Sequence, residues 1–207
     1  MKSLKTVAYA AAIIIILIGL GAITVGAVGQ QQVRDQLARE KIVGTPDMKP
    51  SEHPGKGLTC DVADKAINTG DRANCFAGYM RLHALESTKD KTYAEMPRFV
   101  DAAGKPTDDE SAAATDPKTG QPAANNARNI WVTETALSTA LNMSFFAESV
   151  ALFSMVSGLA LLLTGLLLLA LIHRPGRVTG PRRASGATRS APRSAKRTPS
   201  RRRPARG

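Results

Sequence analysis

The chain has 207 residues, of which 43% are hydrophobic but only 4% are aromatic. A soluble domain of this size draws much of its buried area from Phe, Tyr and Trp, so the composition argues against an ordinary soluble core. The net charge of +11 is spread unevenly along the chain. This segregation indicates a membrane protein, and it identifies no chemical activity.

Residues 7–29 form the first apolar segment and carry no charge. A helix of this length covers about 34 Å at a rise of 1.5 Å per residue, which is enough to cross a bilayer. We therefore predict a cytoplasmic N-terminus over residues 1–6 and a transmembrane helix over residues 7–29. A cleaved signal peptide is the alternative, but its apolar stretch would be shorter, at about 7–15 residues.

The second apolar segment lies near the C-terminus, where residues 152–172 carry no charge. We predict a second transmembrane helix over residues 143–172. Glu148 is the one acid of this helix. We expect it about one turn or more outside the hydrocarbon edge, where it can bond the first helix near Gln30. The alternative is a deeper position, which would suggest proton or ion handling.

Charge asymmetry predicts the orientation, because cytoplasmic flanks of membrane spans carry an excess of Lys and Arg. Two lysines precede the first apolar segment, and twelve basic residues and no acid follow the second. All 17 acidic residues lie between the two charge-free segments, together with 14 basic residues. Both termini are therefore expected in the cytoplasm, with the two helices antiparallel and residues 30–142 outside.

Small residues recur in both predicted helices at alternating steps of four and three. Helices associate in lipid through close approach at such residues, and an average step of 3.5 is the repeat of a left-handed pair. We expect the two helices of one chain to pack together, and a homo-oligomer using the same faces is the alternative. The predicted packing residues are Gly19, Ala22, Gly26, Ala151, Ser154 and Gly158.

The predicted fold class is an all-α membrane protein whose two antiparallel transmembrane helices extend into a small, mostly helical extracytoplasmic domain over residues 30–142. Apolar residues at helical spacing continue both helices outward, over residues 30–41 and 129–141. No strand pattern is visible between them. Residues 104–126 have almost nothing to bury, and they are predicted to form a flexible loop.

Shorter elements are expected inside this domain. Residues 61–67 are compatible with a short helix, and Asp71 is a suitable N-cap for a second helix that ends near Glu86. A third short turn is expected over residues 92–96, because Pro97 cannot continue a helix.

Cys60 and Cys75 are the only cysteines, and both fall in the segment predicted outside the membrane. A disulfide persists there, and closing a loop of this length stabilises the fold by about 3 kcal/mol. We predict a structural disulfide. A redox-active pair is the alternative, although the Cys-x-x-Cys spacing of such pairs is missing.

Two histidines, His53 and His83, lie outside the predicted membrane boundary. With Glu52 or Glu86 they can be imagined as a two-histidine, one-carboxylate metal site. We predict no metal site, because Glu52 and His53 are neighbours that point apart and His83 with Glu86 is typical of a helix-surface pair. Phosphate-binding loops, nucleophile elbows and zinc-binding helix motifs are also missing, so no catalytic residue, cofactor or enzyme activity is predicted.

Residues 173–207 alternate Arg with Pro, Gly, Ser, Ala and Thr, and we predict a disordered basic cytoplasmic tail. A polybasic segment beside a membrane span attracts anionic lipid headgroups. Nucleic acid is a less expected partner, because no aromatic residues are interleaved with the charges. The predicted lipid-binding residues are Arg174, Arg177, Arg182 and Arg183.

The two-span layout and the runs LHALEST at residues 82–88 and KTYAEM at residues 91–96 resemble a group of small actinobacterial membrane proteins with no established activity. The resemblance implies a bacterial plasma membrane as the location, and it implies no catalytic residues. Such proteins are sometimes labelled ring-opening dioxygenases, a label that the missing metal-ligand pattern argues against here.

The sequence therefore predicts a non-enzymatic accessory or scaffolding subunit of a membrane complex, which docks on a membrane-protein partner through its outer domain. The alternative is a membrane-anchored sensor whose basic tail binds anionic lipids or nucleic acid. Exposed aromatic residues are expected to contact the partner, namely Phe76, Tyr79, Tyr93 and Trp131.

Overall fold

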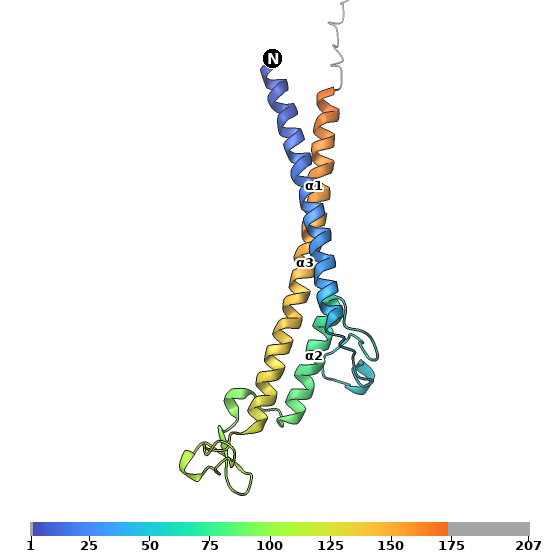
Figure 1. Cartoon of the computed structure of the whole chain (residues 1–207). Coiled ribbons are helices and arrows are strands. Elements are labelled where there is room, and N and C mark those ends of the chain that lie inside the picture. Colours follow the sequence, from blue (N-terminus) through green and yellow to red (C-terminus); the bar gives the residue numbers. More distant parts are fainter. Residues whose placement is uncertain (1, 174–207) are drawn as a thin grey trace, which may run out of the picture. The chain divides into compact units, whose positions relative to one another are not determined.

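The structure is a computed structural model that describes residues 2–173 (Figure 1). The predicted basic tail and its lipid-binding residues Arg174, Arg177, Arg182 and Arg183 lie outside the described residues. The described part is mostly helical, as predicted. Its elements are α1 (Lys2–Arg39), η1 (Pro50–Glu52), α2 (Gly70–Ser87), η2 (Tyr93–Glu95), β1 (Phe99–Val100), β2 (Pro106–Thr107), η3 (Glu110–Ala112) and α3 (Asn126–His173).

Helices α1 and α3 have 38 and 48 residues, and both are long and apolar enough to cross a membrane. Each continues well beyond its apolar segment, because helical apolar spacing persists into the polar flanks. Figure 1 shows the two helices side by side. Their large apolar side chains mostly point away from the contact between them and remain exposed.

Small residues bring the backbones of α1 and α3 into direct contact. A Cβ atom on Gly19 would lie 2.7 Å from the carbonyl oxygen of Gly158, and one on Gly26 would lie 2.6 Å from that of Ala151. The hydroxyl of Ser154 donates a hydrogen bond of 3.0 Å to the carbonyl oxygen of Ala22. All six packing residues predicted from the sequence therefore lie at this contact.

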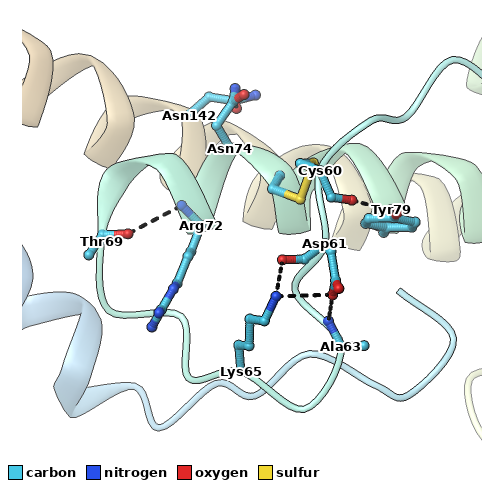
Figure 2. Close-up of a disulfide and its surroundings, with 10 residues drawn as sticks. Cys60, Asp61, Ala63, Lys65, Thr69, Arg72, Asn74, Tyr79 and Asn142 are labelled. Atoms are coloured by element: carbon cyan, nitrogen blue, oxygen red, sulfur yellow. Dashed lines mark hydrogen bonds and ion pairs between the residues drawn. A yellow bond between two sulfur atoms is a disulfide. The ribbon is translucent and has the colours of Figure 1, made fainter. Parts of the chain in front are cut away.

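Helix α2 packs against the part of α3 that precedes its apolar segment, and the loop over residues 40–69 covers another side of α2. Met48, Val62 and Ile67 anchor this loop in the core formed with α2. The predicted Cys60–Cys75 disulfide is present and joins the loop to the helix (Figure 2). Tyr79 is fully buried beside it and donates a hydrogen bond of 2.8 Å to the carbonyl oxygen of Cys60.

Residues 61–67 do not form the predicted helix. They pair with the chain just after α1 instead, since Ile67 N–H donates to the carbonyl of Ile42 and Asp64 N–H to that of Gly44. The close approach requires glycine, because a Cβ atom on Gly44 would collide with the carbonyl oxygen of Val62. Local helix propensity is outweighed here by pairing that buries the apolar side chains.

The start of α2 differs from the prediction by two residues. Thr69, not Asp71, is the N-cap, and its side chain accepts a hydrogen bond from Arg72 N–H (Figure 2). The expected turn over residues 92–96 is present as η2, which begins with a capping box between Thr92 and Glu95. The backbone N–H of Thr92 hydrogen-bonds the Glu95 carboxylate and holds its pKa below the ordinary value.

The segment between η2 and α3 contains two strands that the sequence did not indicate. Strands β1 and β2 pair antiparallel, with Phe99 opposite Thr107, and single bridges join further residues up to position 124. Acidic side chains accept hydrogen bonds from backbone N–H groups of the adjacent turns. For example, Asp101 accepts hydrogen bonds from the N–H groups of Ala103 and Lys105. Local hydrogen bonds of this kind build the segment with little apolar burial, which is why hydrophobic patterning missed it.

The backbone contact predicts a clear difference between two glycines of α1. Gly19→Ala should destabilise the helix pair by about 1–3 kcal/mol, because the new methyl group meets backbone atoms of Gly158 and Leu162. Gly21→Ala is the matched control, since a Cβ atom there meets nothing within 4 Å among the described residues. The stability of both variants is measured by far-UV circular dichroism while SDS is added to the detergent-solubilised protein. Equal loss of stability in the two variants would contradict this packing.

Candidate functional site

Two histidines and a carboxylate meet where the loop after α1 lies against α2. Nε2 of His83 lies 3.0 Å from Oδ2 of Asp47, and Nε2 of His53 lies 3.9 Å from the same oxygen. One side-chain ligand atom from each of the three residues lies within 4.8 Å of the others. Glu86 adds a second carboxylate, whose Oε1 lies 4.0 Å from Nδ1 of His53.

Local structure positions each of these side chains. Asp47 belongs to a turn that is closed by the hydrogen bond from Met48 N–H to the carbonyl of Thr45. Pro46 suits the second position of such a turn. His53 caps the end of η1, and its N–H donates to the carbonyl of Pro50. His83 and Glu86 are three residues apart on α2, so they share one face of the helix.

The surroundings of Asp47 favour the ionised form of its carboxyl group. Its pKa lies below the ordinary value, mainly because the side chain of Thr45 hydrogen-bonds the carboxylate, with smaller contributions from the charges of His83 and His53. Partial removal from water acts in the opposite direction and does not outweigh these effects. The carboxylate is therefore ionised at neutral pH.

His53 is the most enclosed member of the cluster, with 12% of its side chain exposed. Its ring centroid lies 5.6 Å from that of Tyr79 and 5.7 Å from that of His83. Burial raises the pKa of Tyr79, which therefore stays a neutral phenol. Nε2 of His53 is buried and has no hydrogen-bond partner within the described residues. A buried nitrogen in this state costs free energy unless something binds it.

The two-histidine, one-carboxylate site considered from the sequence, and set aside there, grouped His53 with His83 but took Glu52 or Glu86 as the carboxylate. In the structure Glu52 forms an ion pair of 3.4 Å with Lys49, and Asp47 lies against both histidines instead. Asp47 could not be identified from the sequence, because residues 30 or more positions from His83 carry no periodic signal of contact. The Cys60–Cys75 disulfide was the available signal, since it ties the loop that holds Asp47 and His53 to the helix that holds His83.

A second polar cluster joins α1, α2 and α3 at Glu148. Arg34 of α1 lies 2.6 Å from Oε1 of Glu148, and Gln30 donates to the same oxygen at 3.3 Å, in the place expected from the sequence. The N–H of Gly70, at the first turn of α2, donates to Oε2. A helix N-terminus carries partial positive charge, so it favours this carboxylate. Glu148 therefore fastens α2 to the pair of long helices.

A third cluster fixes the other end of α2. Arg81 of α2 lies 3.5 Å from the buried carboxylate of Glu134 on α3, and its guanidinium lies 4.1 Å from the ring centre of Trp131. The ring packs in a small core with Ala84 and Met96. Stacked and paired in this way, Arg81 holds α2 along α3.

The structure corrects three of the four residues predicted as exposed partner contacts. Phe76 and Tyr79 are buried in the core that α2 forms with the loop and α3, and Trp131 of α3 is buried against Ala84 and Met96. The prediction that they are exposed is therefore wrong. Tyr93 is 42% exposed, and the guanidinium of Arg128 lies 3.9 Å from its ring centre.

An exposed stripe on α3 takes their place as a candidate contact surface. The stripe follows alternating steps of four and three, and every member is exposed. Val132 is 53% exposed and Met143 is 58% exposed, although both belong to a folded helix. A shallow apolar pocket lined by Tyr93, Trp131 and Val132 lies at its outer end. We call these residues the α3 stripe: Val132, Ala136, Thr139, Met143, Phe146, Val150 and Phe153.

Comparison of the chain with protein-family models, with curated proteins and with solved structures gives no match.

Removal of the Glu148 carboxylate should loosen α2 from the long helices. Glu148→Ala leaves the Gly70 N–H and Arg34 without their shared acceptor, so the free energy of unfolding should fall by about 1–3 kcal/mol. Glu52→Ala is the control, because that exposed ion pair is worth less than about 1 kcal/mol. Thermal unfolding in detergent measures both, and a Glu148→Ala variant as stable as the control would contradict this role.

Proposed function

We propose that the protein spans the bacterial plasma membrane twice, with α1 and α3 antiparallel, both termini in the cytoplasm and residues 30–142 on the outer side. Close contacts join Gly26 with Ala151 and Gly19 with Gly158, and a Cβ atom on Gly165 would lie 3.0 Å from the carbonyl oxygen of Ala12. Residue numbers rise along α1 as they fall along α3, which supports opposite directions. The excess of basic residues beyond both apolar segments supports cytoplasmic termini.

Exposed apolar side chains support the membrane location. Leu17 on α1 is 62% exposed and Leu167 on α3 is 60% exposed, and both lie among many others of the same kind. Contiguous apolar surface of this extent is rare on a soluble monomer, whereas lipid covers it at no cost. Helices also satisfy their own backbone hydrogen bonds, as the hydrocarbon core requires.

We further propose that the protein is a non-enzymatic accessory subunit that docks on another membrane protein. The α3 stripe carries this proposal, because lipid can cover only part of it. About 20 residues counted back from Ile172 place the hydrocarbon edge near Phe153. Val132 and Met143 lie well beyond this edge, yet their apolar side chains are exposed.

The partner expected on the α3 stripe is a helix of an integral membrane protein that continues beyond the bilayer beside α3. The stripe stays on one face of α3 from its water-exposed end into its apolar segment. A single partner helix can therefore lie along its whole length. Its 3.5-residue average step is the repeat of left-handed helix packing. The exposed ring of Tyr93 extends the same surface at the outer end.

Site-specific photocrosslinking tests this docking in living cells. A photoreactive amino acid at Val132 or Met143 should form a covalent adduct with a different membrane protein, identified by mass spectrometry after gentle detergent extraction. Gln31, an exposed position on α1, is the control and should give no such adduct.

Two results would overturn the docking proposal. Adducts at twice the mass of the chain would show that a second copy covers the stripe. The lack of any protein adduct from Val132 and Met143, with the probe shown to be reactive, would show that nothing covers it.

A further inference from the structure

We propose that Asp47, His53 and His83 bind one divalent transition-metal ion of the zinc class. This cluster shares no residue with the α3 stripe, so the proposal stands independently of the docking partner. It rests on the convergence of three ligand atoms and on the buried Nε2 of His53, which has no hydrogen-bond partner among the described residues.

The donor set selects the class of metal. Two imidazole nitrogens and one carboxylate oxygen suit Zn²⁺ and its neighbours in the first transition series, whereas Ca²⁺ and Mg²⁺ prefer sets made of oxygen. Thiolate ligands are not offered, because Cys60 and Cys75 form a disulfide. A site of this composition therefore discriminates against the alkaline-earth ions.

The distances are close to those of a metal centre. Zn–N and Zn–O bonds of about 2.0–2.1 Å in tetrahedral geometry place ligand atoms about 3.3 Å apart. Nε2 of His83 lies 3.0 Å from Oδ2 of Asp47, and Nε2 of His53 lies 3.9 Å from it. The three ligand atoms all lie within 4.8 Å of one another, so metal binding requires these side chains to draw closer together. The side chains of Asp47 and His83 are partly exposed, so water can complete the coordination.

Glu86 is placed to act as a positioning residue for His53. Its Oε1 lies 4.0 Å from Nδ1 of the ring, and a hydrogen bond formed on closer approach would favour the tautomer with the proton on Nδ1 and the lone pair on Nε2. Carboxylates in this position orient metal-binding histidines in many metal sites. Thr45 holds the Asp47 carboxylate in the same way through a side-chain hydrogen bond.

The fold holds the ligands together before any metal arrives. Asp47 and His53 come from the loop after α1, while His83 comes from α2. The Cys60–Cys75 disulfide joins these two elements, and Val62 N–H donates to the carbonyl of Met48, next to Asp47. Metal binding would join loop and helix a second time, so it should raise the thermal stability of the protein.

Zn²⁺ titration of the full-length protein tests the site. The protein is purified in detergent through a tag that contains no histidine, with the disulfide intact, and treated with chelator. Isothermal titration calorimetry should show one Zn²⁺ per chain, and His53→Ala and His83→Ala should each weaken binding at least about 100-fold. Glu86→Gln should weaken it about 10-fold, as expected of a residue that orients a ligand.

Two controls separate the site from general zinc binding. His173→Ala removes a histidine that hydrogen-bonds Tyr9 far along the chain, and Glu52→Gln alters the neighbour of His53. Both should bind Zn²⁺ like the wild type, and Ca²⁺ should not compete. Far-UV circular dichroism checks that each variant is folded.

A measurement on the wild type alone guards against variants that fail to fold. Zn²⁺ should raise its melting temperature, and chelator should reverse the change. Wild-type protein that binds no Zn²⁺, or a His53→Ala/His83→Ala double variant that binds it as tightly as the wild type, would overturn the proposal.

Discussion

The direct backbone contact between α1 and α3 is the constraint on which the rest of the structure depends. If α1 and α3 lie in lipid, as proposed, packing and hydrogen bonds replace the hydrophobic effect as the source of their association. Gly19 and Gly158 let the two backbones touch, and Ser154 adds a hydrogen bond across the contact. Because the two helices lie this close together, Arg34 of α1 and the first turn of α2 can both reach the Glu148 carboxylate on α3.

Beyond the contact at Glu148, further contacts hold α2 and the loop against α3. Glu148 fixes one end of α2, and Arg81 with Glu134 and Trp131 fixes the other. The disulfide then ties the loop to the helix. The α3 stripe lies on a helix held in this way, whereas the histidine cluster lies where the disulfide-linked loop meets α2. Both surfaces are thus supported by contacts elsewhere in the fold, as is common for binding sites carried on a scaffold.

The sequence predicted the features that depend on local pattern. The two apolar helices, the small residues at their contact and the pairing of Cys60 with Cys75 all follow from composition and spacing. Features that depend on contacts between distant segments escaped prediction. Trp131 is buried because Ala84 of α2 and Met96 pack against it, and the cluster of Asp47 with His83 exists only because the loop folds back on α2. The strands β1 and β2 are held by turn hydrogen bonds, which leave no hydrophobic pattern to detect.

Cysteine accessibility in intact cells tests most directly whether α1 and α3 cross one membrane in opposite directions. Ser111 is exposed in the loop before α3, whereas Ser3 precedes the apolar part of α1, and Ser185 follows the second apolar segment. With the native disulfide left oxidised, a membrane-impermeant maleimide should label Ser111→Cys in intact cells. It should label Ser3→Cys and Ser185→Cys only after permeabilisation. Labelling of Ser3→Cys or Ser185→Cys in intact cells, or protection of Ser111→Cys, would contradict the proposed topology.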